Sequence, residues 1–290
     1  EWINQRIDRK AYIWWNFPVS DFVRDHVLLG PAYGNGQDIA SDLSGFVSNP
    51  MEHAEASKIA LYGIADYTWN MKAYDYQKDW EKALKAVLPG NYQALRTFAL
   101  YNKDLGPNGH GFRREEGEEL KSLAEAALKG EKEAVMQLLQ KSIELKMASD
   151  ILLSDKENPE LVRELRPWLL QAKNVGDYGV AVCSMALTQA TSASASAFPS
   201  FKNYYDQARS LQEQMYTLEN SDVRHALQPG IKVATKVMLP TLNQLFAQAT
   251  DSYNKVNGTS LVNSAEYNPY KIESNVPQLA LLPISVRGNS

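Results

Sequence analysis

Apolar residues form two short uninterrupted runs near the start of this chain. Residues 11–16 make up an apolar and aromatic run that ends at Asn16 and Pro18, and residues 44–48 make up a second run that ends at Asn49 and Pro50. Short apolar runs that end in turn-forming residues are typical of buried strands. About 28 residues separate the two strand ends, a length that fits one crossover unit between parallel strands.

Helical periodicity replaces these runs further along the chain. We expect helices over residues 52–69, 80–87 and 92–101, where apolar residues recur near every third or fourth position. From residue 115 to about residue 256 the sequence is a succession of helical patterns rich in Leu, Ala, Glu, Lys and Gln. Residues 132–153, for example, carry a broad apolar stripe that would face neighbouring helices. This second part predicts an antiparallel helical bundle.

The densest cluster of turn-forming residues, at residues 104–111, predicts a domain boundary. The fold class is therefore α/β followed by all-α. We expect residues 1–112 to form the α/β part, residues 113–257 the bundle, and residues 258–290 an extended linker towards a further domain. The chain opens on a polar segment with no signal peptide, which suggests that residue 1 is a position within a longer protein.

Composition excludes several classes of function. The 290 residues are 44% hydrophobic and carry a net charge of −4, with no basic stripe for nucleic acid and no apolar run that could span a membrane. The single cysteine, Cys183, lies in an apolar stretch and is predicted to be a buried thiol. His26, His53, His110 and His225 are too scattered to suggest a metal site, and the glycines form no nucleotide-binding loop. We expect neither a metal nor a cofactor.

Polar residues follow both predicted strands and are the first candidates for a functional site. Asn16 and Asn49 end the two runs, and the loop after the first run carries Asp21, Asp25 and His26. Functional residues of parallel barrels lie at the carboxyl ends of the strands. A mixture of carboxylates, amides and indoles suits a sugar, because the polar groups bind hydroxyls while an aromatic ring covers the apolar face.

A purely structural interpretation of these residues stays open from the pattern alone. Trp14 and Trp15 lie in a strand and could belong to the core. Ser20 and Asp21 could cap a following helix.

Four longer segments favour the interpretation of these residues as a sugar site. Residues 12–26, 44–55, 65–70 and 104–114 resemble the bacterial members of glycoside hydrolase family 84. These are the O-GlcNAcase-type β-N-acetylglucosaminidases, and some of them carry the name hyaluronidase. The resemblance extends through the predicted bundle to Val276 and so covers nearly the whole chain.

The resemblance implies a fold and a mechanism. In this family a (β/α)8 TIM barrel precedes a helical bundle, so residues 1–112 would be the last strands and helices of the barrel. Catalysis is substrate-assisted: the 2-acetamido group of the substrate attacks its own anomeric carbon, and two adjacent aspartates assist. No Asp-Asp dipeptide occurs in this sequence. We therefore expect the catalytic pair upstream of residue 1, and this chain alone to be inactive.

The resemblance also implies roles for four residues of this chain. Trp14 would line the acetamido pocket, Asn16 and Asp21 would bind the outer sugar hydroxyls, and Asn49 would make a further polar contact with the sugar. Asp25 and His26 belong to the matched segment, but we assign them to the local structure and not to substrate contact.

The expected partner is a terminal β-linked N-acetylglucosamine on glycoproteins or glycans, and the resemblance favours a protein exported from a bacterium. Two alternatives stay open. The bundle could be a non-catalytic module for homodimerisation or for contact with the protein part of a substrate, or the enzyme could be a true hyaluronidase. We also expect residues 1 to about 112 to be rearranged or self-associated, because a truncated barrel exposes strand edges and apolar surface.

Overall fold

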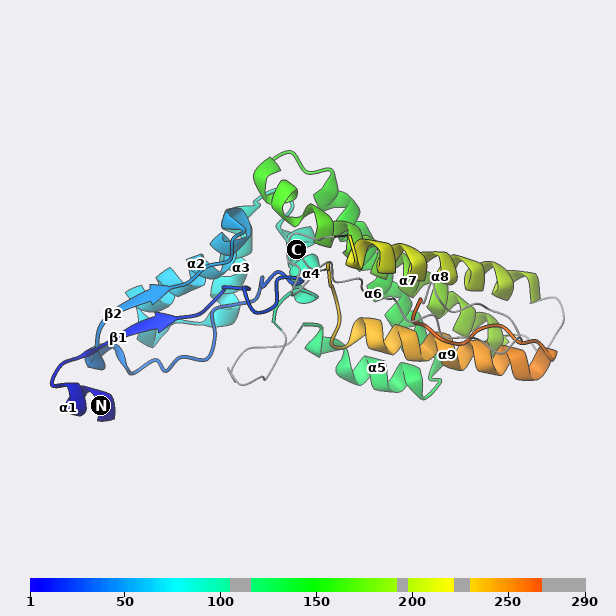
Figure 1. Ribbon diagram of the computed structural model, residues 1–290, viewed down its shortest axis with the longest axis horizontal. Helices are drawn as coiled ribbons and strands as arrows, with labels where there is room; N and C mark the ends of the chain where they lie inside the picture. The colour runs from blue at the N-terminus through cyan, green and yellow to red at the C-terminus, as the bar shows by residue number, and fades with distance from the viewer. Residues whose placement is uncertain (105–115, 192–197, 222–229, 268–290) are drawn as a thin grey trace, which may run out of the picture.

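The structure of the chain is a computed structural model that describes residues 1–104, 116–191, 198–221 and 230–267. The described part is elongated, with a small sheet and its helices at one end and long helices at the other (Figure 1). Most of the predicted linker lies outside the described residues. In chain order the elements are α1 (Trp2–Ile7), β1 (Ala11–Trp15), the 3-10 helix η1 (Ala40–Asp42), β2 (Leu43–Ser48), α2 (Ala54–Trp69), η2 (Met71–Ala73), α3 (Tyr76–Val87), α4 (Tyr92–Leu100), η3 (Glu118–Leu120), α5 (Lys121–Leu128), α6 (Lys132–Leu153), α7 (Pro159–Thr191), α8 (Phe198–Glu219) and α9 (Met238–Asn257).

The two predicted strands are confirmed and pair in parallel. The register places Tyr12 beside Gly45 and Trp15 beside Ser48. A Cβ atom on Gly45 would lie 2.2 Å from the Tyr12 ring, so the tyrosine occupies the space that a side chain would need. With any other residue at this position the exposed Tyr12 ring would have to turn aside.

The connection between the strands differs from the expected crossover helix. Between β1 and η1 the chain runs through turns and extended segments without an α-helix. The idea that Ser20 and Asp21 cap a helix is therefore wrong. Prolines at positions 18 and 31 and glycines at 30, 34 and 36 explain the difference, because both residue types disfavour a helix interior.

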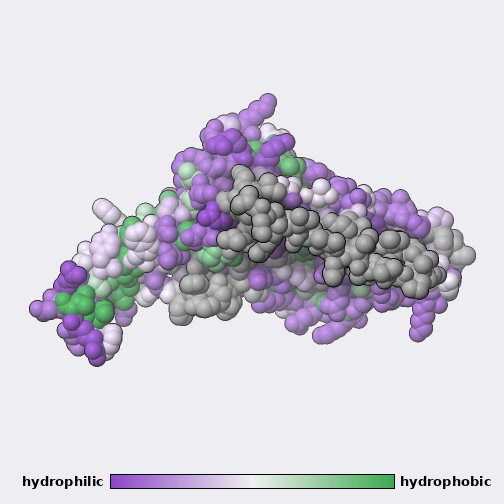
Figure 2. All heavy atoms as spheres, viewed as in Figure 1, coloured by the Kyte–Doolittle hydropathy of each residue, from purple (hydrophilic) through white to green (hydrophobic). Residues whose placement is uncertain are grey.

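Among the described residues, only one face of the sheet is covered. Trp15 and Phe46 pack towards α2, with their rings 5.6 Å apart in an edge-on arrangement. On the opposite face Tyr12 and Trp14 are 63% and 66% exposed. The strands are thus half-buried instead of buried, although a parallel sheet normally has both faces covered. Hydrophobic side chains gather over α1 and the two strands in Figure 2.

The long helices α6, α7, α8 and α9 pack side by side around a continuous core, with α5 alongside (Figure 1). Trp168, Tyr178 and Phe246 are among its largest buried side chains, and Cys183 is buried there as predicted. Burial raises the pKa of the Cys183 thiol to about 12. The helix predicted over residues 132–153 coincides with α6.

Two glycines of α7 bring α6 into close contact. A Cβ atom at Gly176 would lie 2.8 Å from the backbone nitrogen of Lys146 and the carbonyl oxygen of Ser142. One at Gly179 would lie 2.2 Å from the Ser142 hydroxyl. The backbones of the two helices can approach this closely only because no side chain stands between them.

The hydrophobic core continues across the predicted boundary at residues 104–111. Residues 27–29 and apolar side chains of α2, α3 and α4 belong to the same buried cluster as the long helices. The carboxylate of Glu164 on α7 accepts the backbone N–H groups of Glu55 and Ala56, at 2.9 and 3.0 Å, and so caps the first turn of α2. The two ends of the molecule are therefore joined by both apolar and polar contacts.

Candidate sugar-binding site

Three of the four predicted sugar-binding residues lie together at the carboxyl ends of the strands. The indole Nε1 of Trp14 donates to Oδ1 of Asn16 at 2.7 Å. The amide Nδ2 of Asn49 donates to the same oxygen at 3.2 Å. One amide oxygen thus orients an indole and a second amide, and we call these three residues the strand-end cluster.

Strand pairing explains why two asparagines 33 positions apart in the chain meet. Trp15 pairs with Ser48, so the next residue of each strand, Asn16 or Asn49, lies at the same edge. The backbone N–H of Asn49 donates to the carbonyl of Trp15 at 2.9 Å, and the Ser48 hydroxyl donates to the carbonyl of Phe17 at 2.7 Å. These bonds fix the backbone beneath the cluster.

Asp21, the fourth predicted residue, lies in the turn that follows. Its side chain is exposed. Within the described part of the chain, no hydrogen bond joins it to the strand-end cluster. The turn itself is ordered by the backbone N–H of Val23, which donates to the carbonyl of the buried Ser20 at 2.9 Å.

Asp25 and His26 form a buried junction with the second half of the chain. Nδ1 of His26 lies 2.8 Å from Oδ1 of Asp25, and the ammonium of Lys232 lies 3.0 Å from Oδ2. Burial alone would raise the pKa of the Asp25 carboxyl, but the hydrogen bonds and charges of His26 and Lys232 outweigh it and lower the pKa to about 2. The backbone carbonyl of Asp25 accepts both the indole Nε1 of Trp168, at 2.9 Å, and the N–H of Lys232, at 2.8 Å.

A second buried carboxylate extends this junction. Nε2 of His26 lies 3.3 Å from the hydroxyl of Thr235, and that hydroxyl donates to Oε1 of Glu116 at 2.6 Å. Burial raises the pKa of the Glu116 carboxyl despite the nearby His26 and the bonds from Thr235. These contacts agree with the structural role assigned to Asp25 and His26, although both residues lie in turns and not in a helix.

Sequence reasoning did not identify the partners in this junction. His26 and Thr235 are 209 positions apart, and neither Lys232 nor Glu116 belongs to a recognisable motif. The only sequence signal was that Asp25 and His26 are adjacent polar residues next to an apolar stretch.

Side chains that could bind a metal are dispersed over the described ranges. There, no three or more His, Cys, Asp or Glu side chains group in a way that could hold a metal ion. His53 packs edge-on against Trp168 with ring centroids 5.1 Å apart. His110 and His225 lie outside the described residues. Over the same ranges, no helix is long and apolar enough to cross a membrane.

The strand-end cluster can bind a neutral hydroxylated ring. Amide groups of Asn16 and Asn49 can donate to and accept from hydroxyls, and the exposed indole of Trp14 offers an apolar surface. Neither amides nor an indole transfer protons at neutral pH. The three residues are therefore suited to binding and not to acid or base catalysis.

Comparisons with known proteins identify three matching family models. Residues 1–100 match beta-N-acetylglucosaminidase, residues 115–246 match the post-catalytic domain of bacterial GH84, and residues 261–290 match carbohydrate binding module family 32. The first two models meet close to the predicted boundary.

Solved structures share this fold. CpGH84D matches with a TM-score of 0.73 at 25% identity, over 86% of this chain and 41% of that chain. CpGH84B matches with a TM-score of 0.71 at 22% identity, over 84% and 40%. A mutant of an O-GlcNAc hydrolase from Thermobaculum terrenum matches with a TM-score of 0.66 at 20% identity, over 89% and 54%. The chain spans about half or less of the length of these proteins. The two consecutive family models and the shared fold show that the chain belongs to glycoside hydrolase family 84.

Proposed function

We propose that this chain is part of a retaining exo-β-N-acetylglucosaminidase of the O-GlcNAcase type, and that it forms one side of the sugar pocket. The observation that carries this proposal is the strand-end cluster, in which Trp14 and Asn49 converge on the amide oxygen of Asn16. The cluster lies where a (β/α)8 barrel holds its substrate. The exposed faces of Tyr12 and Trp14 suit the interior of such a barrel, of which β1 and β2 would be the last strands.

In this proposal each residue of the cluster binds a different part of the sugar. The Trp14 indole covers the acetamido group, Asn16 and Asp21 bind the outer hydroxyls, and Asn49 adds a polar contact. The acetamido group of the substrate itself attacks the anomeric carbon, so no nucleophile of the protein is required. The two adjacent aspartates that assist this step lie outside this chain, which contains no Asp-Asp dipeptide.

The proposed substrate is a terminal β-linked N-acetylglucosamine on a glycoprotein or glycan, and the proposed location is outside the bacterial cytoplasm. The match of residues 261–290 to a carbohydrate-binding module supports both proposals, because such a module would hold a glycan close to the pocket. A pocket that accepts terminal sugars fits hyaluronan less well. Release of oligosaccharides from hyaluronan would favour the hyaluronidase alternative instead.

The proposal is tested by hydrolysis of an aryl β-N-acetylglucosaminide, measured with this chain alone and with a longer protein that carries the upstream strands. We expect activity only in the longer protein. Asp21→Ala in that protein should lower kcat/KM by about a hundredfold, since a hydrogen-bonded carboxylate that holds the sugar in place is lost. Asp38→Ala is a matched control, because Asp38 is an exposed aspartate of the same connection. Unchanged turnover in Asp21→Ala would contradict the role of Asp21, and activity in this chain alone would contradict the upstream position of the catalytic pair.

A second candidate function, contact with another protein or a second copy, rests on one face of α6. Met136, Met147 and Ile151 are exposed there, and helical geometry places them within about 60° of one another. Sedimentation of the Met136→Gln/Met147→Gln variant tests a homodimer. The variant should be monomeric at a concentration where the unmodified chain and a Lys141→Gln control are dimeric. A strict monomer for the unmodified chain would contradict the dimer.

A further inference from the structure

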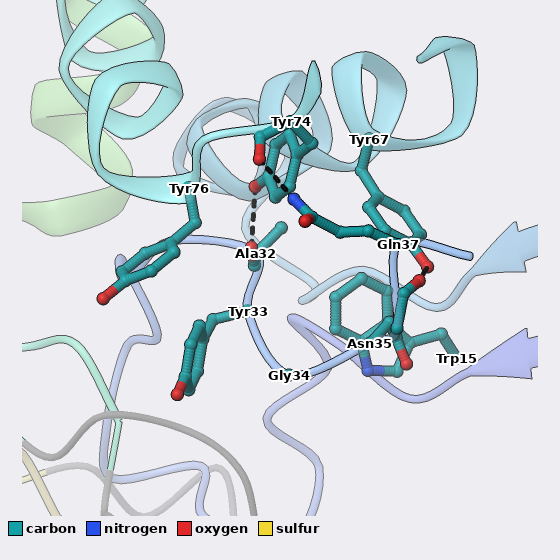
Figure 3. A pocket seen from close by; sticks show the side chains of 10 residues that line it. Trp15, Ala32, Tyr33, Gly34, Asn35, Gln37, Tyr67, Tyr74 and Tyr76 are labelled. Carbon is teal, nitrogen blue, oxygen red and sulfur yellow. Dashed lines mark hydrogen bonds between the residues drawn. The ribbon is translucent and has the colours of Figure 1, made fainter. Parts of the chain in front are cut away.

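A cavity of about 510 Å³ lies on the helix side of the sheet, away from the strand-end cluster. Trp15 contributes one wall, and successive side chains of a strand point to opposite faces, so this wall is separated from Trp14 by the sheet. The other walls come from residues 32–37 and from tyrosines of α2 and of the segment that leads into α3 (Figure 3).

The lining is aromatic and uncharged. Four tyrosines and one tryptophan surround the cavity, and Asn35 and Gln37 add two amide side chains. None of the ten described residues that line it carries a charge at neutral pH. Such a surface favours a neutral ligand that has both an apolar ring face and hydroxyl groups.

The segment that forms one wall is held in place before any ligand binds. The Tyr74 hydroxyl donates to the carbonyl of Ala32 at 2.6 Å, and the Tyr67 hydroxyl donates to the carbonyl of Gly36 at 2.6 Å. The amide of Gln37 donates to the carbonyl of Tyr74 at 2.5 Å. These three bonds anchor both ends of the segment, as Figure 3 shows. Gly34 adopts φ 106° between them, a conformation that favours glycine.

The side chains of Tyr33 and Asn35 take no part in these three bonds. Tyr33 is 37% exposed, and its ring lies 4.6 Å from that of Tyr76 at an angle of 54°. The Asn35 Nδ2 group is buried and has no hydrogen-bond partner in the described part of the chain. A buried donor without a partner destabilises the protein, so a turn of the Asn35 side chain that exposes this donor to a sugar hydroxyl would be favourable.

We propose that this cavity is a second sugar-binding site, which holds a neutral pyranose ring against Tyr33 and Tyr76 while a sugar hydroxyl accepts from Asn35. The cavity volume falls within the range of about 300–1,000 Å³ that is typical of small-molecule sites. The site is separate from the strand-end cluster and does not depend on the catalytic role proposed above. It would anchor a glycan on the outer side of the sheet.

The experiment uses this 290-residue chain and the probe methyl β-N-acetylglucosaminide, with binding followed by saturation-transfer NMR. A Trp14→Ala background weakens the strand-end cluster, and the part of the remaining binding that depends on Tyr33 reports on the cavity. In that background we expect Tyr33→Ala to weaken binding about tenfold, as expected for a lost ring contact, and Tyr33→Phe to retain it. Tyr62→Ala is the matched control, since Tyr62 is 38% exposed and lies on α2 outside the cavity lining.

Asn35→Ala keeps the test valid if a tyrosine variant folds poorly. Removing a buried donor that has no partner should leave the melting temperature unchanged or raise it, while sugar binding weakens. A variant that is equally stable and binds less cannot be explained by misfolding. Absence of binding in the Trp14→Ala background, or equal binding by Tyr33→Ala and Tyr62→Ala, would overturn the proposal. Loss of catalysis in the longer protein would bear only on the strand-end cluster.

Discussion

Tryptophan side chains have opposite environments in two parts of this molecule. Trp14 on the sheet is 66% exposed, whereas Trp168 on α7 is 2% exposed and donates its indole N–H to the carbonyl of Asp25. Trp14 lies in an apolar run and Trp168 in a helix of mixed polarity, so the difference comes from what covers each residue. The helices around Trp168 come from within this chain, whereas nothing in the described residues covers Trp14.

The comparison separates side chains that stabilise the fold from those available for binding. The core around Trp168 is closed, and burying an aromatic side chain there removes a large apolar area from water. The exposed face of the sheet leaves apolar area in water, so its side chains contribute little to the stability of the fold. Such a surface is typical of an interaction site. We therefore expect the same substitution, tryptophan to alanine, to change the free energy of unfolding much more in the core than on the exposed face of the sheet.

The largest expected effect is in the core. Trp168→Ala should lower the free energy of unfolding by about 4 kcal/mol, because it opens a large cavity and removes the bond to Asp25. Urea unfolding followed by circular dichroism measures this change. A loss below about 1 kcal/mol would show that the core around α7 collapses easily, and the comparison with Trp14 would fail.

The next effect is at the junction between the two ends. Asp25→Asn should lower the free energy of unfolding by about 3 kcal/mol, because it removes the negative partner of Lys232 and His26 in a buried setting. Asp21→Asn, in the neighbouring exposed turn, should change stability by less than about 0.5 kcal/mol. The same unfolding experiment compares them, and equal values would contradict a special role for the junction.

Acid should weaken the same junction. The pKa of Asp25 is lowered to about 2 in the folded chain from an ordinary value of 3.8. The unfolded state therefore binds the proton more tightly, so this carboxylate contributes its stability above about pH 4, and the contribution is lost as the pH falls towards 2. The expected loss is about 2 kcal/mol. Stability measured from pH 6 to pH 2 should contain this component in the unmodified chain and lack it in Asp25→Asn.

A smaller effect is expected where α6 and α7 touch. Gly176→Ala should cost about 1.5 kcal/mol although alanine favours helices, because the added methyl group meets the backbone of α6. Asp177→Ala, at the next position, removes only a partly exposed pair with Lys173 and should cost less than about 1 kcal/mol. A stabilising Gly176→Ala would show that the two helices are free to move apart.

The smallest expected effect on stability is on the sheet. Trp14→Ala should change the free energy of unfolding of this chain by less than about 0.5 kcal/mol, because the ring is mostly in water. In a longer, active protein the same variant should bind N-acetylglucosamine inhibitors at least tenfold more weakly. A large loss of stability in this chain would indicate that the exposed face is covered, for example by self-association as predicted for residues 1 to about 112.

Local patterns predicted the elements well where one physical signal dominated. The aromatic runs gave β1 and β2 to within one residue, and the apolar stripe gave α6. Helix α3 begins at Tyr76 and not at residue 80, because the Asp75 side chain accepts the N–H groups of Gln77 and Lys78. That cap is a sequence signal which an apolar count alone does not detect.

The arrangement of the candidate site was predictable in part for the same reason. Asn16 and Asn49 each end a run, and parallel pairing was enough to bring them together. The exposed state of Trp14 could not be predicted, because a strand pattern does not reveal which face is covered. The cavity next to Tyr33 could not be predicted either, because the crossover was expected to be helical and the packing of Tyr67 of α2 and of Tyr74 against residues 32–37 is a long-range contact.

The backbone carbonyl of Asp25 has a mechanical consequence. This oxygen accepts one hydrogen bond from α7 and another from the segment before α9, so two distant parts of the chain are bonded to the same atom. Asp21 lies only four positions away along the same turn-rich backbone. A force that draws the long helices away from the sheet would therefore load this turn directly, together with the Glu164 cap of α2 and the continuous core.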